Sequence, residues 1–339
     1  MLPEIGQDGQ EKLKAANVLV IGCGGLGCPV LQYLAAAGVG GLGIIDHDFV
    51  DVSNLQRQIL FSTEDIGKPK VLTAKNKLEK YNPLITITAI QDKLNVSNAI
   101  DLIRNYQIIV DCSDNFPTRY LANDACVILD KPLVSGSIYK FEGQVSVFNY
   151  LKGPTYRCLY PNPPQQENIS DCSQTGVLGT LTGITGTLMA NEVIKIITGM
   201  GNVLSGKLLS FDLLSSRVQI FNYKLVPKNR QITKLSSDYN LSSNSEIKEI
   251  NAQELKDKIL RNESIQIIDV REPEEFLERN IGGILIPLGQ LEQNLDKINK
   301  DIPSVIVCRS GRRSMYAAKI LQKNNFNKVY NLIGGLIEY

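Results

Sequence analysis

The first half of the chain alternates between short apolar runs and stretches with helical spacing of apolar residues. The run at Val18–Ile21 leads into a glycine-rich turn and a small-residue helix ending near Gly38. The same alternation predicts strands at Leu42–Ile45, Ile85–Ile90 and Ile108–Asp111 and a helix at Lys68–Tyr81. Short connections between such elements are typical of a parallel, doubly wound α/β sheet with helices on both faces.

After Pro132 the pattern changes from buried runs to alternation. Gln144–Phe148 alternates apolar and polar residues, as a half-buried antiparallel strand does. Residues 151–175 are rich in Pro, Asn, Gln and Ser and predict a long crossover loop. A helix at Val177–Thr198 and strands at Lys207–Phe211 and Arg217–Tyr223 complete a Rossmann-like fold in which antiparallel strands continue the parallel ones.

A serine- and asparagine-rich stretch separates this unit from a second, smaller alternation. Its composition predicts a linker at residues 229–246 between an ATP-binding domain at 1–228 and a small α/β domain at 247–339. The elements predicted in the second domain are helices at Asn251–Leu260 and Arg313–Lys323 and strands at Ile265–Val270, Ser304–Val307 and Lys328–Asn331.

Composition excludes several classes of protein. The 36 basic and 35 acidic residues give a net charge of +1, so neither nucleic acid nor an anionic membrane is an expected partner. Seven widely spread cysteines, with no signal peptide before them, predict a reducing, cytoplasmic setting. The uncharged run at residues 17–45 is long enough for a membrane helix, but its glycines and Pro29 favour strand, turn, helix and strand. His47 is the one histidine, which excludes multi-histidine metal sites.

A glycine motif predicts a nucleotide site in the first domain. Gly22, Gly24 and Gly27 form G-x-G-x-x-G between a strand and a helix, where glycine lets phosphates approach the backbone. Asp46 follows Gly27 by 19 residues and ends the next strand, where a carboxylate can accept hydrogen bonds from ribose hydroxyls. These residues alone are compatible with an NAD-dependent oxidoreductase as well as with an ATP-binding enzyme.

The residues after Asp46 favour ATP. Arg57 and Lys70 supply two cations close behind the ribose carboxylate, as a triphosphate requires. Asp114 follows the strand at Ile108–Asp111, at the sheet edge where ligands bind in such folds, and its carboxylate suits Mg²⁺. An oxidoreductase would leave these three side chains unexplained.

Together these segments resemble the MoeB/ThiF/HesA family, which adenylates ubiquitin-like sulfur carriers, and the molybdopterin-synthase adenylyltransferases in particular. The similarity covers residues 2–223 and rests on the glycine motif, Asp46-x-Asp48-x-Val50, Ser53-Asn54-Leu55-x-Arg57-Gln58, Gly67-x-Pro69-Lys70 and Cys112-Ser113-Asp114-Asn115. The resemblance implies that Arg57, Lys70 and Asp114 act in catalysis, that Asp114 binds Mg²⁺, and that the nucleotide is held by Gly22, Gly24, Gly25, Gly27, Asp46, Asn54, Arg57, Gln58, Lys70 and Asp114.

The chain departs from the family pattern at two places and keeps it at a third. The Arg-Gln pair that commonly precedes the segment at Leu2 is absent, which implies either a trimmed start or weakened ATP turnover. Cys158 is the one cysteine left of the family's two zinc-binding Cys-x-x-Cys pairs, so we expect no zinc. Cys172 matches the family's reactive cysteine, and it is a candidate for a thioester or persulfide acceptor.

The second domain resembles the rhodanese-like domains. The similarity covers residues 249–339 and rests on the segment Ile267–Phe276, on Ile281–Ile284 and on the loop Cys308, Arg309, Ser310, Gly311, Arg312, Arg313 and Ser314. Cys308 ends a strand and opens a loop into a helix, where backbone N–H groups favour an anion. Arg309, Arg312 and Arg313 are expected to add positive charge beside a catalytic persulfide.

The two resemblances predict a fused enzyme. The first domain would use ATP and Mg²⁺ to adenylate the C-terminal glycine of a small carrier ending in Gly-Gly, and Cys308 would supply sulfur for a thiocarboxylate. The carrier would belong to molybdopterin synthase or, alternatively, to thiamine biosynthesis. The resemblance also implies a homodimer and a sulfur donor such as a cysteine desulfurase. A non-catalytic scaffold that only holds the carrier is the alternative from another class.

Overall fold

The computed structural model describes residues 2–163, 176–237, 239 and 247–339. The chain divides into two compact units, Met1–Leu241 and Ser242–Tyr339. Each unit is described by itself. None of the described helices is both long and apolar enough to cross a membrane.

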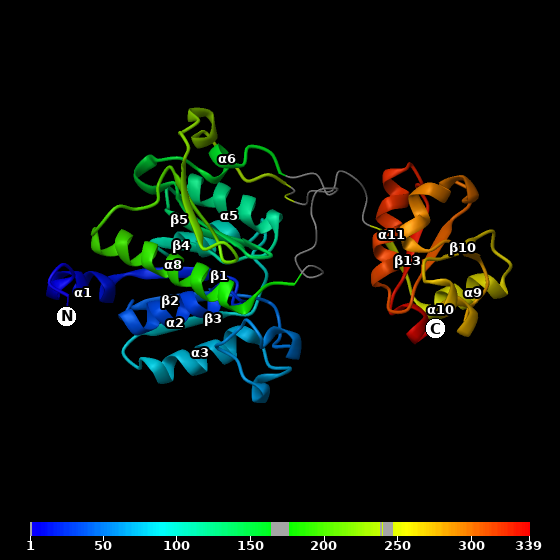
Figure 1. The fold of residues 1–339 in the computed structure, drawn as a ribbon, viewed down its shortest axis with the longest axis horizontal. Coiled ribbons are helices and arrows are strands. Elements are labelled where there is room, and N and C mark those ends of the chain that lie inside the picture. Colours follow the sequence, from blue (N-terminus) through cyan, green and yellow to red (C-terminus); the bar gives the residue numbers. More distant parts are fainter. Residues whose placement is uncertain (1, 164–175, 238, 240–246) are drawn as a thin grey trace. The chain divides into compact units, whose positions relative to one another are not determined.

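The first unit is built on an eight-stranded sheet with the order β3-β2-β1-β4-β5-β6-β7-β8 (Figure 1). The pairs from β3 to β5 are parallel and those from β5 to β8 are antiparallel. The strands are β1 Asn17–Ile21, β2 Gly41–Ile45, β3 Thr86–Ile90, β4 Ile108–Asp111, β5 Leu133–Tyr139, β6 Glu142–Phe148, β7 Lys207–Asp212 and β8 Arg217–Asn222. The predicted parallel sheet with an antiparallel continuation is therefore confirmed.

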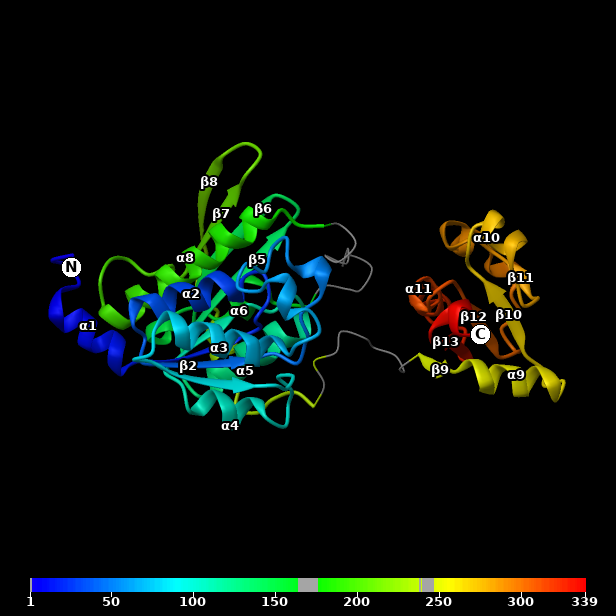
Figure 2. The ribbon, with the colours of Figure 1, turned by 90° about the horizontal axis from the view of Figure 1, so that it is seen from below.

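Helices cover both faces of this sheet. The alternating side chains of β1 show the two layers, since Val18 and Val20 pack into one apolar cluster and Leu19 and Ile21 into the other. The first cluster includes residues of α2 Gly27–Ala37, α3 Lys70–Tyr81 and α8 Gly179–Thr198. The second includes residues of α4 Ala99–Arg104, α5 Phe116–Ile128 and α6 Tyr156–Leu159. Figure 2 shows α2 and α8 on the side of the sheet opposite α4.

Several elements were not predicted from the sequence. These are α1 Gly6–Ala15, α4, α5 and β5 in the first unit. Strand β5 contains Gly136 between two serines, Ser135 and Ser137, and a Cβ at Gly136 would overlap Met189 of α8. Its side chains are small because α8 packs closely on the sheet, so the strand lacks the apolar run by which buried strands are recognised.

The region that composition assigns to the linker begins on the first unit. The 3₁₀ helix Pro227–Arg230 is held by the guanidinium of Arg230, which donates to Asn149 at 2.6 Å and to Asp130 at 3.0 Å. Further along, Leu235 and Tyr239 pack against the second apolar cluster. The first unit thus continues to Leu241, beyond residue 228.

The second unit has a five-stranded parallel sheet with the order β11-β10-β12-β13-β9. The strands are β9 Lys248–Ile250, β10 Gln266–Asp269, β11 Ile284–Leu285, β12 Ser304–Val307 and β13 Val329–Leu332. The helices are α9 Ala252–Leu260, α10 Pro273–Glu278, α11 Arg312–Lys323 and α12 Gly335–Glu338, with a 3₁₀ stretch at Leu288–Lys297. Apolar clusters lie on both faces of this sheet, as in a small α/β domain.

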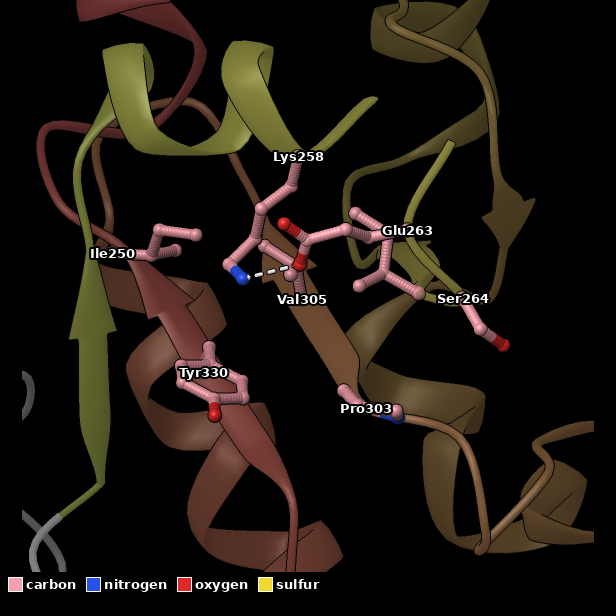
Figure 3. A pocket seen from close by; sticks show the side chains of 8 residues that line it. Ile250, Lys258, Glu263, Ser264, Pro303, Val305 and Tyr330 are labelled. Carbon is pink, nitrogen blue, oxygen red and sulfur yellow. Dashed lines mark hydrogen bonds and ion pairs between the residues drawn. The ribbon is translucent and has the colours of Figure 1, made fainter. Parts of the chain in front are cut away.

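A cavity of about 260 Å³ lies in the second unit beside α9. Lys258 and Glu263 form an ion pair of 2.6 Å at its rim, and Tyr330 and Val305 contribute from the sheet (Figure 3). Pro303, at the start of β12, also lines it, whereas Cys308 follows the other end of that strand. The cavity is therefore separate from the cysteine loop.

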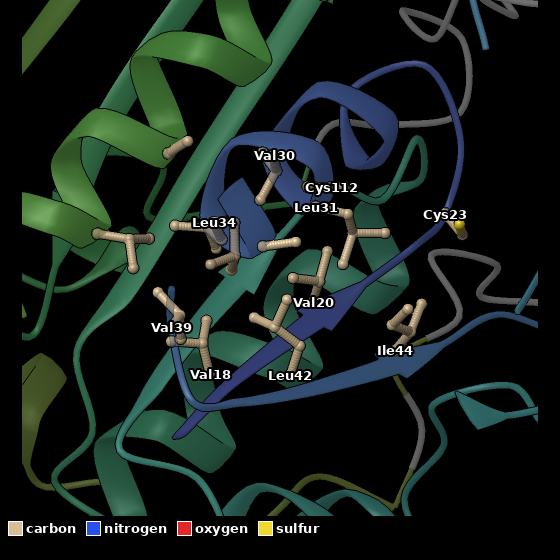
Figure 4. Close-up of a cluster of buried hydrophobic side chains, with 14 of the residues drawn as sticks. Val18, Val20, Cys23, Val30, Leu31, Leu34, Val39, Leu42, Ile44 and Cys112 are labelled. Carbon is tan, nitrogen blue, oxygen red and sulfur yellow. The ribbon is translucent and has the colours of Figure 1, made fainter. Parts of the chain in front are cut away.

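The uncharged run at residues 17–45 forms β1, α2 and β2, as predicted, and lies in the core of the first unit. Figure 4 shows Val18 and Val20 of β1, Leu31 and Leu34 of α2 and Leu42 of β2 packed against one another. All of these side chains are nearly fully buried. Burial of such side chains contributes about 1.5–3 kcal/mol each, which explains why this segment lacks charge.

Candidate functional site

The first site forms where the strand order reverses. Since β1 lies between β2 and β4, the chain continues from β1 to one side of the sheet and from β4 to the other. Ligands of open α/β sheets bind at this switch point, outside the carboxyl ends of the strands. The glycine motif follows β1, Asp46 follows β2 and the Cys112–Asn115 segment follows β4. The topology therefore brings three of the predicted segments to one edge.

Glycine is required at the positions of the motif for different structural reasons. Gly22 has φ +94°, and a Cβ there would lie 3.0 Å from the carbonyl oxygen of Cys112. A Cβ at Gly27 would overlap the carbonyl oxygen of Gly22, and one at Gly25 would lie 2.9 Å from Thr182. Of these glycines, only Gly24 has room for a Cβ, because the nearest atom to that Cβ would be Gln58 Nε2 at 3.6 Å. Close packing explains three glycines, whereas Gly24 leaves space for a ligand.

Asp46 closes the glycine loop against the next strand. Its carboxylate accepts hydrogen bonds from the backbone N–H groups of Cys23, at 2.7 Å, and Asp48, at 2.8 Å. The residue is half-buried, so the carboxylate remains accessible. Sequence reasoning assigned Asp46 to the ribose, and the structure adds a second role in fixing the loop.

The two predicted cations differ in environment. Lys70 opens α3 and is only 5% exposed, and its ammonium pairs with the exposed carboxylate of Asp48 at 2.9 Å. Arg57 is half-buried and donates to the carbonyl of Ser53 at 3.1 Å. Asn54 is also half-buried and lies, like Ser53, in the 3₁₀ helix Val52–Asn54. At a position as dry as that of Lys70, the Coulomb attraction between an ammonium group and a bound phosphate is less weakened by water than at the surface.

Gln58 carries an unpaired polar atom. The side chain is 4% exposed, and its Oε1 has no hydrogen-bond partner among the described residues. A buried amide oxygen without a partner is costly, and in native structures such a group usually has a functional explanation. The atom of this amide nearest to the open position at Gly24 is the nitrogen Nε2, so Gln58 offers a donor to a polar ligand bound over the glycine loop.

The segment after β4 combines an exposed and a buried carboxylate. Asp114 is exposed, and its described hydrogen bond, from Asn115, is long at 3.4 Å. Asp111 is fully buried and accepts hydrogen bonds from Ser113 and Ser135. An exposed carboxylate fits Mg²⁺, which is usually held by one or two carboxylates together with phosphate oxygens.

A supporting residue was missed by sequence reasoning. Arg119 of α5 donates to the carbonyl of Ser113 at 3.0 Å, so it holds the loop that carries Asp114. Burial is the largest single influence on Arg119 and by itself would lower its pKa, but the charge of Asp111 together with Tyr156 and Tyr160 raises the pKa overall. An arginine three residues into a helix has no sequence signature that would have revealed this role.

Among the described residues, one group could offer three metal ligands. It consists of Asp46, His47 and Asp48, whose ligand atoms lie within 4.8 Å of one another. Asp48 is already paired with Lys70, and Asp46 accepts two backbone hydrogen bonds. These partners occupy the carboxylates, so Asp114 remains the better candidate for Mg²⁺.

Three cysteines of the first unit are structural. Cys23, Cys112 and Cys126 are buried. Hydrogen bonding with Cys28 and then burial raise the pKa of Cys23, and burial above all raises the pKa of Cys112 and Cys126. These residues remain neutral thiols at neutral pH, and none of them is a good nucleophile.

The sulfur of Cys158 lies among polar groups. Its sulfur accepts hydrogen bonds from the backbone N–H of Val226 at 3.3 Å and from Thr155 N–H at 3.4 Å, and Asn229 approaches at 3.7 Å. Burial opposes ionisation of Cys158, but a hydrogen bond with the Thr155 hydroxyl, at 3.4 Å, and the bonds above together outweigh burial and lower its pKa. Cys172, the other predicted reactive cysteine, lies outside the described residues.

The second site is the loop between β12 and α11. Cys308 is 1% exposed, and its sulfur accepts a hydrogen bond from the backbone N–H of Ser314 at 3.3 Å. The hydroxyl of Ser314 lies 3.3 Å from the same sulfur and donates to Asn331 at 2.7 Å. Gly311 turns the loop with φ +84°. Because Ser314 lies in the first turn of α11, its N–H is one of the helix donors that have no partner within the helix.

The three arginines of the loop do not act alike, which corrects the expectation from the sequence. Arg313 is paired in a bidentate manner with Glu275 of α10, at 2.6 and 2.7 Å. The hydrogen bond from Arg313 lowers the pKa of Glu275 to about 2. Arg309 and Arg312, with Ser310, are exposed. Two arginines therefore remain to attract an anion, while the third fixes the loop to its neighbour.

Comparison with known proteins agrees with both sites. The ThiF family matches residues 1–232. The chain belongs to the ThiF family. A rhodanese-like domain follows at residues 251–339. These matches confirm the predicted fusion of an adenylation unit with a rhodanese-like unit, and they exclude the NAD-dependent oxidoreductase.

Two relatives align with nearly the whole of this chain and with most of their own length. The "Probable adenylyltransferase/sulfurtransferase MoeZ" of Mycobacterium tuberculosis is 40% identical over 100% of this chain and 90% of its own. The "Probable molybdopterin-synthase adenylyltransferase" of Porphyra purpurea is 41% identical over 99% of this chain and 90% of its own. Their names support the prediction that this ThiF-family chain is an adenylyltransferase and sulfurtransferase.

A solved structure supports the fold of the first unit. The crystal structure of E. coli MccB with ATP has a TM-score of 0.59 and 26% identity, over 67% of this chain and 69% of that one. The Rossmann-like adenylation fold predicted from the sequence is thereby confirmed.

Proposed function

We propose that the first unit adenylates the C-terminal glycine of a small ubiquitin-like carrier of the molybdopterin-synthase type, and that Cys308 supplies the sulfur. The observation that carries the proposal is the combination of the open position at Gly24, the unpaired Gln58 and the buried Lys70 at one sheet edge. The Porphyra relative's name supports molybdopterin synthase as the source of the carrier.

Alignment and charge neutralisation are enough for the first step. A carrier's terminal carboxylate is ionised at neutral pH and attacks the α-phosphorus of ATP without a general base, and pyrophosphate leaves. We assign Asp46 to the ribose, and Asn54, Arg57 and Lys70 to the phosphates. Asp114 would hold Mg²⁺, which neutralises phosphate charge when bound.

The second step uses the cysteine loop of the other unit. A persulfide donor, such as a cysteine desulfurase, passes one sulfur atom to Cys308 and leaves as a thiol. The terminal sulfur of the Cys308 persulfide then displaces AMP from the acyl-adenylate. A further thiol attacks the Cys308 sulfur of the acyl disulfide, which releases the thiocarboxylate and leaves a disulfide between that thiol and Cys308. A second thiol reduces this disulfide and restores Cys308. Donors at the start of α11 and the exposed Arg309 and Arg312 favour the anionic persulfide. Cys172 stays a predicted acceptor thiol.

ATP–pyrophosphate exchange tests the proposal. The purified chain is incubated with labelled pyrophosphate, ATP and Mg²⁺, and with either a molybdopterin-synthase small subunit or a thiamine-pathway carrier. We expect exchange with the molybdopterin carrier, lost in Lys70→Ala. Exchange with the thiamine carrier alone would reassign the pathway, and binding of ATP without exchange by either carrier would favour the scaffold.

A further inference from the structure

Two polar side chains lie in the packing between α11 and the sheet of the second unit. Ser314 of α11 is 0% exposed, and Asn331 of β13 is 3% exposed. The sheet register aligns Asn331 with Ile306 of β12, which packs into an apolar cluster together with residues of α11. Burying a polar group costs free energy unless it has a hydrogen-bond partner, so the partners of this pair are informative.

The partners form a row of hydrogen bonds that ends at the Cys308 sulfur. The hydroxyl of Ser314 donates to Oδ1 of Asn331 at 2.7 Å and lies 3.3 Å from Sγ of Cys308. On its other side, Nδ2 of Asn331 donates to Oε1 of Glu249 at 3.5 Å. Glu249 is exposed, and it lies on β9 directly beside Asn331 in the sheet. The amide of Asn331 therefore lies between a buried hydroxyl and an exposed carboxylate.

The single hydrogen of the Ser314 hydroxyl limits what this row can do. The hydroxyl cannot donate to Asn331 and to Cys308 at the same time. While it donates to Asn331, the neutral thiol of Cys308 can donate to the Ser314 oxygen, so the observed arrangement fits the thiol. A thiolate or a persulfide anion has no hydrogen to give. This hydroxyl stabilises such an anion only if its hydrogen turns toward the sulfur.

An amide can serve both states of the sulfur. A half-turn of the amide plane places Nδ2 of Asn331 where Oδ1 was, so that Asn331 donates to the Ser314 oxygen and Ser314 donates to the sulfur anion. The half-turn gives up only the long hydrogen bond to Glu249, whose carboxylate is exposed to water. A carboxylate in place of the amide only accepts, so it would keep the Ser314 hydrogen away from the sulfur.

We propose that Asn331 is a positioning residue for sulfur transfer: its amide sets, through Ser314, whether that hydroxyl accepts from the Cys308 thiol or donates to the sulfur anion. The proposal rests on the proposed function of Cys308. Each round of transfer begins with the Cys308 thiolate as nucleophile and passes through the persulfide anion. A hydroxyl that is free to donate to both anions therefore speeds the reaction.

Sulfur transfer from thiosulfate to cyanide tests the proposal without ATP or carrier. The Cys308 thiolate takes the outer sulfur of thiosulfate as the S–S bond breaks and sulfite leaves with the electron pair. Cyanide then removes that sulfur as thiocyanate, which restores the thiolate. Asn331→Asp keeps the shape of the side chain, and it should lower kcat about 10- to 100-fold, as loss of a hydrogen bond to a charged group does. The KM for thiosulfate should change by less than about twofold, because the buried Asn331 does not contact the donor.

Asn331→Leu separates this role from a merely structural one. Leucine neither donates nor accepts, so it leaves the Ser314 hydroxyl free to donate to the sulfur, and kcat should stay close to that of wild type. A side chain that only ties β13 to α11 would give the reverse order, since aspartate still accepts from Ser314 and leucine does not. Ser314→Ala should lose about as much as Asn331→Asp, and the double variant should lose little more.

Two controls accompany these variants. Asn324→Asp makes the same substitution at the end of α11, where the amide donates to the carbonyl of Ile320 at 2.9 Å, and it should leave kcat unchanged. Glu249→Gln added to Asn331→Asp removes repulsion between the two carboxylates, and it should not restore kcat. Urea unfolding of each variant measures the folded fraction.

Every outcome bears on the positioning role. Equal kcat in wild type and Asn331→Asp would overturn it, and so would a larger loss in Asn331→Leu, recovery by Glu249→Gln, or a loss that a smaller folded fraction explains. A wild-type chain that transfers no sulfur from thiosulfate or from a persulfide donor would instead contradict the proposed function of Cys308, and the role of Asn331 with it.

Discussion

The two units build their sites in opposite ways. The first assembles its site from segments after β1, β2 and β4 and at the start of α3, and it leaves an unpaired amide at Gln58 and an open position at Gly24. The second places one sulfur, on Cys308, in a single loop, where the backbone N–H of Ser314 already donates to it and the Ser314 hydroxyl lies 3.3 Å away. A site that admits a large nucleotide must leave polar groups unpaired, whereas a site for one transferable atom can be complete beforehand.

The largest expected effect follows from the second site. Cys308→Ser should reduce thiocarboxylate formation to background, because a hydroxyl cannot form a persulfide, and should leave ATP–pyrophosphate exchange unchanged. Mass spectrometry of the carrier and the exchange assay measure the two activities on the same preparation. Cys126→Ser, at a buried thiol with a raised pKa, is the control and should keep both. Loss of exchange in Cys308→Ser would show that the two sites are not independent.

The matching experiment at the first site removes the buried cation. Lys70→Ala should lower the exchange rate by about 10²–10³-fold, as loss of one preorganised charge commonly does. The persulfide content of Cys308 after donor treatment should not change. Lys68→Ala removes a lysine whose side chain is 58% exposed, and it should keep most of the exchange activity. Equal losses in both variants would mean that overall charge, not the position of Lys70, matters.

The glycine motif offers a comparison within the first site. Gly27→Ala should destabilise the unit by about 1–3 kcal/mol, because its Cβ would overlap a backbone carbonyl. Gly24→Ala should change the free energy of unfolding by less than about 0.5 kcal/mol, yet it should raise the KM for ATP. Urea unfolding and exchange kinetics measure the two effects. A stable Gly27→Ala chain would contradict the packing explanation.

The smallest expected effect concerns pH. Arg313 lowers the pKa of Glu275 to about 2, from an ordinary value of 4.5. A depressed pKa contributes stability above about pH 4.5, and this contribution is lost as the pH falls toward 2. Glu275→Gln should therefore unfold at a lower urea concentration at pH 7 and differ little from wild type near pH 2. A constant difference at both pH values would show that the ion pair does not cause it.

Contiguity explains what could be predicted from the sequence. The residues Cys308–Ser314 are adjacent in the chain, so one motif located the whole loop. The glycine motif and Asp46 were also found, because each follows a recognisable strand. The pairing of Arg313 with Glu275, 38 residues away, was not predicted, since three arginines in one loop give no sign of which one has a partner.

Long-range packing explains what could not be predicted. The burial of Gln58 and the support of the Asp114 loop by Arg119 depend on elements that meet only in the folded sheet. Strand β5 was missed because α8 requires small residues on it. The linker was predicted from its serines and asparagines. Composition does not reveal that Tyr239 donates a hydrogen bond to Asp124, which lies 115 residues earlier in the chain.

The most direct test of the account is the product itself. The intact chain is incubated with ATP, Mg²⁺, a persulfide donor and the molybdopterin-synthase small subunit, and the carrier is analysed by mass spectrometry. We predict replacement of one carboxylate oxygen by sulfur, dependent on both Lys70 and Cys308. A thiocarboxylate that forms equally well without Cys308, or a carrier that is never adenylated, would contradict the account.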